Sequence, residues 1–292
     1  MSPDIPYTAA QDDLFNPGRR EGFFSPKPRS DAALCAEMAR LAYCRKEPDF
    51  GFDRERIEKL LAGIEFRPLK FVESIGTPRG TGAHCLLAVA DDSLKAGKLA
   101  VASFRGTDIK DRRDLLYDVD ALLETWNGPG RVHRGFASAL EVVRSRLEEA
   151  IQQVGECRLL YTGHSLGAAM ATLMAAVRAP DALYTFGSPR VGDTTFVEAL
   201  KNVESYRYVD CCDLVARVPP AIEYQHLGVP YYIQRDRQVV IDPSEKLMRS
   251  DRFFGFVDYE VRYALRKGNE TWRGFADHAP MNYISPVKAS SP

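Results

Sequence analysis

Ser165 lies at the centre of the pentapeptide GHSLG, which spans residues 163–167. An apolar, strand-like run (159–162) leads directly into it, and an Ala-rich helical run (166–178) follows. So sharp a turn between strand and helix forces the serine into strained backbone angles, and only glycines fit on either side of it. The pattern predicts a nucleophilic serine at the carboxyl edge of a sheet. The alternative is a Gly/Ser turn that leads into a helix and has no chemistry.

A nucleophilic serine needs a base within hydrogen-bond distance, and that base needs a carboxylate to orient it. Two histidines follow Ser165 in the sequence, His226 and His278. His226 stands beside a strand-like run, where we expect it to support structure. His278 occupies a late loop from which a histidine can reach back over the sheet edge. We therefore predict that His278 is the general base.

The carboxylate has three candidates, Asp193, Asp210 and Asp213. Each of them follows a strand or a strand-to-helix turn, and in hydrolases with this kind of serine turn the acid lies between the serine and the histidine in the chain. Spacing alone leaves the choice among the three open.

The elements that must position these residues alternate along the chain. Strands are expected at 86–90, 99–104, 159–162, 182–186 and 206–210, and several of these runs are apolar on both faces. A first helix is expected to begin at Ser30 or Asp31 and to bury Leu34, Met38 and Leu41 on one face. Two more helices are expected over 136–154 and 166–178. This alternation predicts the α/β class, with a mostly parallel sheet covered by helices on both faces.

We expect one domain over residues 30–285. Residues 1–29 hold five prolines and are expected to form an extended arm without regular structure, pinned to the body by Phe23 and Phe24. Residues 286–292 are expected to form a loose tail.

Composition excludes several classes of function. Lysine and arginine number 39 against 40 aspartate and glutamate, a net charge of -1, so no global positive field exists to bind nucleic acid. No apolar run approaches the roughly eighteen residues that span a bilayer. The six cysteines show no metal-ligand spacing, and vicinal Cys211 and Cys212 are either a redox-sensitive element or two small buried residues. Without a visible leader we expect a cytoplasmic protein, extracellular only if a leader was removed.

Four further motifs accompany the serine pentapeptide: FRGT at 104–107, HRGF at 133–136, FGSPRVG at 186–192 and DLVARVPP at 213–220. This ordered set resembles the class 3 lipase family, the fungal-lipase-like α/β-hydrolases, over residues 30–285. The resemblance implies an α/β-hydrolase fold and a triad of Ser165, Asp213 and His278. It also implies that the backbone N–H groups of Thr107 and Leu166 form the oxyanion hole.

The resemblance implies a serine carboxylic ester hydrolase, a lipase or esterase that acts on acylglycerol-like or other lipophilic esters and makes transient contact with a lipid interface. A phospholipase A1 or a feruloyl-type esterase would use the same triad. A non-enzymatic binding module on a hydrolase fold is the alternative from another class. We expect no cofactor and no metal ion, because His133 and His164 have no ligand partners at suitable spacing and are expected to pack around the serine turn.

Two segments bear on substrate access. Residues 108–117 match the family's mobile lid in position but are rich in charge, so a functional lid and a solvated loop are equally supported. The segment 230–266, between acid and histidine, is expected to hold a strand pair and a helix. Its apolar residues form either an acyl-binding wall or the anchor of that helix: Phe253, Phe254, Phe256, Val257 and Tyr259.

Overall fold

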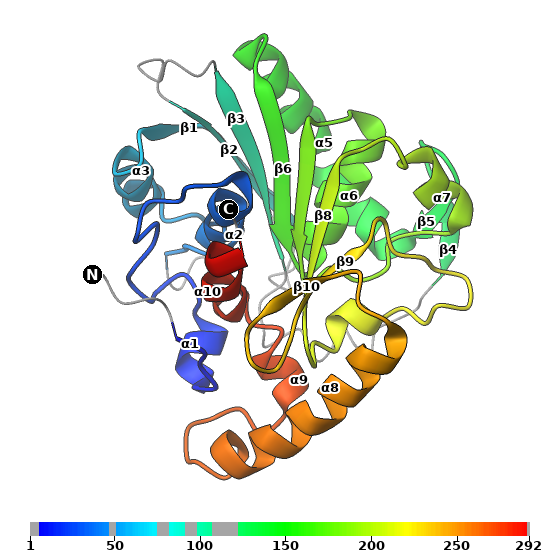
Figure 1. Ribbon diagram of the computed structural model, residues 1–292. Coiled ribbons are helices and arrows are strands. Elements are labelled where there is room, and N and C mark those ends of the chain that lie inside the picture. The colour runs from blue at the N-terminus through cyan, green and yellow to red at the C-terminus, as the bar shows by residue number, and fades with distance from the viewer. Residues whose placement is uncertain (1–5, 47–50, 75–81, 91–97, 107–121, 291–292) are drawn as a thin grey trace.

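A computed structural model of the protein describes residues 6–46, 51–74, 82–90, 98–106 and 122–290. An eight-stranded sheet with the order β1-β2-β3-β6-β7-β8-β9-β10 forms its centre (Figure 1). Strands β3, β6, β7, β8 and β9 run parallel, and β1, β2 and β10 pair antiparallel with their neighbours. These strands are β1 (Phe66–Glu73), β2 (His84–Ala90), β3 (Leu99–Arg105), β6 (Arg158–His164), β7 (Ala182–Phe186), β8 (Ser205–Asp210), β9 (Pro230–Ile233) and β10 (Val239–Ile241).

Helices cover both faces of this sheet, as the alternating pattern predicts (Figure 1). On one face lie α2 (Asp31–Leu41) and α10 (Pro280–Ser290), which also contact each other. On the other face lie α5 (Arg134–Val154) and α6 (Leu166–Val177). Ser30 is the residue that caps α2, because its Oγ accepts a hydrogen bond from the N–H of Ala33 at 3.2 Å.

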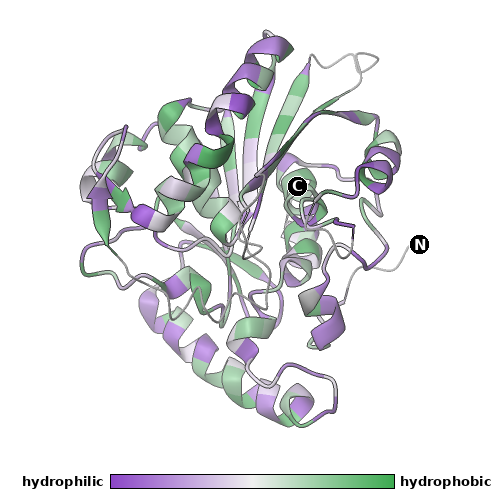
Figure 2. Cartoon of the chain, turned by 180° about the vertical axis from the view of Figure 1, so that it is seen from behind, coloured by the Kyte–Doolittle hydropathy of each residue, from purple (hydrophilic) through white to green (hydrophobic). Residues whose placement is uncertain are grey.

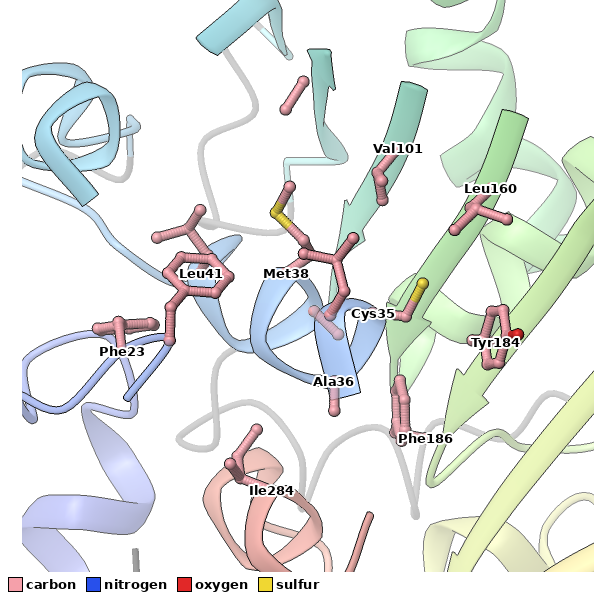
Figure 3. Close-up of a cluster of buried hydrophobic side chains, with 14 of the residues drawn as sticks. Phe23, Cys35, Ala36, Met38, Leu41, Val101, Leu160, Tyr184, Phe186 and Ile284 are labelled. Atoms are coloured by element: carbon pink, nitrogen blue, oxygen red, sulfur yellow. The ribbon is translucent and has the colours of Figure 1, made fainter. Parts of the chain in front are cut away.

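Two apolar cores lie on the two faces of the sheet, and the strands alternate between them. In β6, Leu160 belongs to the core under α2, whereas Leu159 and Tyr161 belong to the core under α5 and α6. Figure 3 shows the first core, with Met38 and Cys35 of α2 and Val101 and Leu160 of the sheet among its labelled side chains. Burying a leucine of this size stabilises the fold by about 1.5–3 kcal/mol relative to leaving it in water. The parallel strands that carry the site are therefore rigidly held.

Both chain ends differ from the sequence expectation. The arm contains a short helix, α1 (Gln11–Phe15), although Phe23 and Phe24 do pin the arm to the first core as predicted. The expectation of a loose tail is wrong for residues 286–290, which complete α10. The physical reason is burial, because Val287 is fully buried against the same core and Lys288 Nζ pairs with Glu37 Oε1 at 2.6 Å.

A long excursion separates β8 from the C-terminal helix α10. It holds the single turn η1 (Val215–Arg217), the pair β9 and β10, and α8 (Glu245–Tyr259), which continues into the π-helical turn η2 (Glu260–Ala264) and is followed by α9 (Arg273–Ala276). In Figure 1 α8 lies beyond the carboxyl ends of the parallel strands. The remaining elements are α3 (Arg54–Ala62), the two-stranded sheet β4 (Leu123–Thr125) and β5 (Arg131–His133), and α7 (Thr194–Ala199). Among the described helices, none is both long and apolar enough to cross a bilayer.

Candidate active site

The turn between β6 and α6 has the strain that its sequence predicts. Ser165 adopts φ 61° and ψ -129°, a backbone conformation that is strained for any residue other than glycine. A methyl group added at Gly163 would lie 2.3 Å from the carbonyl carbon of Gly167, and one added at Gly167 would lie 2.1 Å from the carbonyl oxygen of Phe104. Both glycines are therefore sterically required, and Ser165 stands between a strand end and a helix N-terminus.

Three of the predicted site residues form one hydrogen-bonded chain. His278 Nε2 lies 2.9 Å from Ser165 Oγ, and His278 Nδ1 lies 2.9 Å from Asp213 Oδ2. All three side chains are fully buried. The residues are 113 and 65 positions apart in the chain, so the fold alone brings them together.

Among the described residues, four hydrogen bonds hold the Asp213 carboxylate. Besides His278, its Oδ1 accepts from the N–H groups of Val215 and Ala216 at 2.8 and 3.3 Å, and its Oδ2 accepts from the Tyr283 hydroxyl at 2.5 Å. Burial by itself would raise the pKa of Asp213, but the charge of His278 and these hydrogen bonds together hold that pKa below its ordinary value. Asp213 therefore remains a carboxylate over the whole neutral range.

Tyr283 is a site residue that sequence reasoning missed. It lies on α10, five positions after His278, and its hydroxyl contacts both Asp213 and the N–H of Asp210 at 3.1 Å. A tyrosine in an apolar helical stretch is normally a core residue, and the only sequence signal was its closeness to His278. Burial and the neighbouring carboxylates raise the pKa of Tyr283 well above its ordinary value, so its hydroxyl stays a donor.

Gly187 makes room for the pairing of acid and base. It follows β7 directly, has φ +58°, and a methyl group there would lie 2.6 Å from Asp213 Oδ2 and 2.9 Å from His278 Nδ1. Only glycine tolerates both this backbone conformation and this contact. The glycine of the FGSPRVG motif thus leaves the room in which the Asp213 and His278 side chains meet.

The other acid candidates have different partners. Asp210 forms a bidentate ion pair with Arg237, with Nη1 at 3.0 and 2.7 Å from its two oxygens. Asp193 caps α7, because its Oδ1 accepts from the N–H of Phe196 at 2.9 Å. His226 Nε2 lies 2.9 Å from the carbonyl oxygen of Ala216, which agrees with its expected structural role.

The histidine inside the pentapeptide holds the loop of His278. His164 is fully buried, and its Nε2 lies 2.7 Å from the carbonyl oxygen of His278 while its Nδ1 lies 2.9 Å from the Tyr43 hydroxyl. These contacts agree with the expectation that His164 packs around the serine turn. His133 stacks on Phe136 with ring centroids 4.0 Å apart, which agrees with the same expectation.

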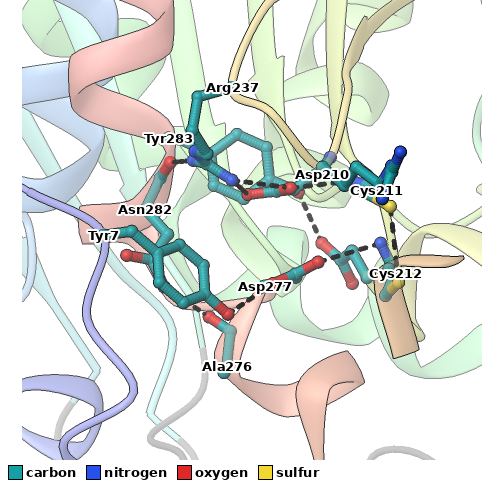
Figure 4. A network of polar contacts seen from close by, with 12 residues as sticks. Tyr7, Asp210, Cys211, Cys212, Arg237, Ala276, Asp277, Asn282 and Tyr283 are labelled. Carbon is teal, nitrogen blue, oxygen red and sulfur yellow. Dashed lines mark hydrogen bonds and ion pairs between the residues drawn. The ribbon is translucent and has the colours of Figure 1, made fainter. Parts of the chain in front are cut away.

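A buried polar network lies behind the acid (Figure 4). Asp277 precedes His278 and accepts hydrogen bonds from the Tyr7 hydroxyl at 2.7 Å, from Arg273 Nε at 3.0 Å and from the Cys212 N–H at 3.0 Å. The N-terminal segment thus braces the loop that carries the base.

The two vicinal cysteines belong to this network. Their sulfur atoms are 3.4 Å apart and buried, and both lie within 4.8 Å of a carboxylate oxygen of Asp277, a spacing that a cation would accept. The Arg273 guanidinium already balances the charge of Asp277. Cys211 and Cys212 are thus buried thiols packed in the turn before Asp213, as one of the two sequence interpretations has it.

Of the two residues predicted to form the oxyanion hole, Leu166 lies among the described residues. Leu166 is the first residue of α6, where a backbone N–H has no acceptor within the helix and the helix dipole favours negative charge. Thr107 and the segment 108–117 lie outside the described residues. Ser165 and His278 expose no surface to solvent.

The apolar residues of α8 are not arranged as either sequence interpretation requires. Of the five residues named in the sequence analysis, Tyr259 alone is buried and anchors the helix. Phe253, Phe254, Phe256 and Val257 are 38–65% exposed, so they face solvent instead of a closed acyl pocket.

Comparison with known proteins identifies one family and several similar proteins. The family model described as lipase (class 3) matches residues 101–223. The chain is 34% identical over 173 residues to secreted mono- and diacylglycerol lipase 1 of Fusarium solani, which covers 54% of this chain and 49% of that protein. It is 32% identical over 229 residues to triacylglycerol lipase OBL1 of Nicotiana tabacum, covering 72% of this chain and 38% of that protein. The chain thus spans half or less of these relatives.

Among solved structures, the Lip2 lipase of Yarrowia lipolytica superposes with a TM-score of 0.61 at 22% identity, over 78% of this chain and 89% of that one. This likeness concerns the fold, and it confirms the predicted α/β-hydrolase architecture. Over residues 101–223 the chain therefore matches the class 3 lipase family, and it is similar to lipases in sequence and in fold.

Proposed function

We propose that the protein is a serine carboxylic ester hydrolase, a lipase or esterase that cleaves acylglycerol-like esters through an acyl-enzyme on Ser165. The observation that carries the proposal is the unbroken hydrogen-bonded chain from Ser165 Oγ through His278 to Asp213, with both distances at 2.9 Å. Geometry of this kind activates a hydroxyl that is otherwise a weak nucleophile.

In the proposed reaction, Ser165 Oγ attacks the acyl carbonyl carbon while His278 Nε2 accepts the hydroxyl proton. Asp213 orients the imidazole and stabilises the imidazolium, and His278 then gives the proton to the leaving alcohol. Water deprotonated by His278 hydrolyses the acyl-enzyme and releases the fatty acid. The backbone N–H groups of Leu166 and Thr107 are the proposed oxyanion donors, and loss of one such donor lowers turnover by about 10²–10³-fold.

The proposed substrate class rests on the relatives, which are named as lipases of mono- and diacylglycerols and of triacylglycerols. A phospholipase A1 or a feruloyl-type esterase would share the triad, and the substrate panel below separates these activities.

The test is hydrolysis of p-nitrophenyl esters from acetate to palmitate, together with mono-, di- and triacylglycerols, phospholipids and feruloyl esters. Ser165→Ala should abolish turnover and labelling by a fluorophosphonate probe while the protein stays folded. Ser250→Ala, which changes an exposed serine of α8, is the matched control and should keep wild-type rates. A wild-type protein that neither turns over any ester nor takes up the probe would overturn the proposal in favour of a binding module.

We also propose a reducing compartment such as the cytoplasm. All six cysteines are free thiols and five are buried, which suits a chain that folds without disulfides. The relative from Fusarium is named as a secreted lipase, which supports the alternative of an extracellular protein. Fractionation of the native cells decides the question: the protein should be recovered with the cytoplasmic fraction, and recovery from the culture medium would contradict this part of the proposal.

A further inference from the structure

The outward face of α8 and of the turn that follows it is apolar. Phe253, Val257 and Val261 recur at intervals of four residues, which places them in one row along the helix, and they are 65%, 49% and 82% exposed. Leu265 continues the row at the same interval with 92% exposure, and Phe254 flanks it. Isolated exposed apolar residues are ordinary, but a continuous row of this kind marks a surface that contacts something apolar.

The inward face of the same helix is already occupied. Tyr259 is buried and its hydroxyl bonds to the carbonyl oxygen of Glu270, and a methyl group at Gly255 would lie 3.0 Å from Cys211 Sγ and 3.1 Å from Cys212 Sγ. The helix therefore packs fully against its own domain on one side. Its exposed row is an additional apolar face, which the domain does not need for its core.

Charge favours one occupant over others. Residues 245–268 carry six lysines and arginines against four acidic residues, and two of those acids, Asp251 and Asp258, are paired with Arg235. The segment is thus locally positive in a chain whose net charge is -1. In Figure 2, green apolar and purple polar bands alternate along this helix. An exposed apolar row in a segment of net positive charge suits an anionic lipid surface, whereas two copies of it face to face would bring like charges together.

The position of the helix is consistent with this occupant. α8 lies beyond the carboxyl ends of the strands, the end at which Ser165 stands (Figure 1). Its inward face contacts Cys211 and Cys212, the two residues directly before Asp213. A surface bound to the outward face of α8 would consequently lie one helix thickness, about 10 Å, from the segment that carries the acid.

We propose that the exposed row along α8, η2 and the residue that follows them, formed by Phe253, Val257, Val261 and Leu265 with the neighbouring basic residues, is a docking surface for an anionic phospholipid bilayer. The proposal rests on the proposed function in that such a surface would hold the lipophilic substrate. It assigns the helix to binding of the lipid surface and not to binding of a single acyl chain.

The test measures binding apart from catalysis. Ser165→Ala protein is sedimented with vesicles of phosphatidylcholine and phosphatidylglycerol in about a 2:1 ratio, and with vesicles of phosphatidylcholine alone. Partitioning should be several-fold stronger on the anionic vesicles. In this background Phe253→Ser with Val257→Ser should lower the partition coefficient at least about tenfold, because both side chains lose their apolar contact with lipid. Val142→Ser, at a 44% exposed position of α5, is the matched control and should change nothing.

Activity of the otherwise unchanged enzyme separates the two proposals. The Phe253→Ser, Val257→Ser variant should hydrolyse p-nitrophenyl acetate at the wild-type rate and lose most of its activity on vesicle-bound ester. No sedimentation with either vesicle, or equal sedimentation of variant and control, overturns the docking surface while leaving the hydrolase intact. A concentration-dependent dimer that the double substitution disperses would assign the face to a second copy instead and would also overturn it. Absence of all Ser165-dependent turnover, with vesicle binding retained, would refute the hydrolase alone.

Discussion

Replacing Tyr283 by phenylalanine removes a single oxygen atom from behind the acid. That hydroxyl donates to Asp213 Oδ2 at 2.5 Å and accepts from the Asp210 N–H at 3.1 Å, and the whole side chain is buried. Phenylalanine keeps the ring and its packing. The substitution therefore tests the two hydrogen bonds and little else.

The magnitude follows from the partners. A hydrogen bond to an ionised carboxylate is worth about 1.5–3 kcal/mol, and an abandoned buried N–H adds about 1 kcal/mol, so Tyr283→Phe should lower the free energy of unfolding by about 2.5–4 kcal/mol. Catalysis should lose less, about tenfold in kcat/KM, because Asp213 keeps its two N–H donors and its contact with His278. With one donor fewer, the Asp213 carboxylate stabilises the imidazolium more strongly. The acid limb of the pH profile should therefore move to higher pH.

Urea unfolding and the pH dependence of kcat/KM on a soluble ester measure these effects. Tyr161→Phe is the control, since the buried hydroxyl of Tyr161 has no hydrogen-bond partner among the residues that the structure describes. Removing that hydroxyl should be neutral or stabilising. A Tyr283→Phe protein with wild-type stability and an unmoved acid limb, or with a limb moved to lower pH, would refute the reasoning.

Three further outcomes are expected. Gly187→Ala should lower kcat/KM at least about 100-fold, because its methyl group would displace Asp213 Oδ2 or His278 Nδ1 and a shift of about 1 Å has that cost; kcat/KM on a short soluble ester measures it, and a near-normal rate would contradict the clash. Between pH 8 and 5, log kcat/KM should fall with a limiting slope of one, because His278 takes up a proton while the lowered pKa of Asp213 keeps that carboxylate ionised; a slope of two would show that the acid titrates as well. Arg237→Ala should destabilise the protein by about 3–5 kcal/mol by leaving Asp210 buried and unpaired. Burial raises the pKa of Asp210 above its unfolded value, so this loss should be larger in urea unfolding at pH 9 than at pH 6, and an equal or smaller loss at pH 9 would contradict it.

The sequence was sufficient for features that arise among neighbouring residues. The serine turn could be predicted because its strain and its two required glycines belong to one pentapeptide. Strands such as β6 could be predicted because apolar residues on both faces of a short run indicate a sheet covered on both sides.

Choices between similar residues needed the fold. Asp193, Asp210 and Asp213 all follow strands or turns, and parallel strands end at the same edge of a sheet, so position along the chain does not distinguish them. The structure distinguishes them by partner: one caps a helix, one pairs with Arg237 and one contacts His278. Tyr283 could not be found from sequence, because its contact with Asp213 joins residues 70 positions apart.

The faces of helices α8 and α10 show most clearly what local sequence determines and what the tertiary structure decides. The sequence interpretations placed the apolar residues of α8 in an acyl-binding wall or against the core, and they left residues 286–292, which include the end of α10, as a loose tail. In the structure Phe253 is exposed and Val287 is buried. Local sequence determines which residues share a helix face, because that depends only on the helical repeat. What the face packs against depends on elements distant in the chain, and only the tertiary structure decides it.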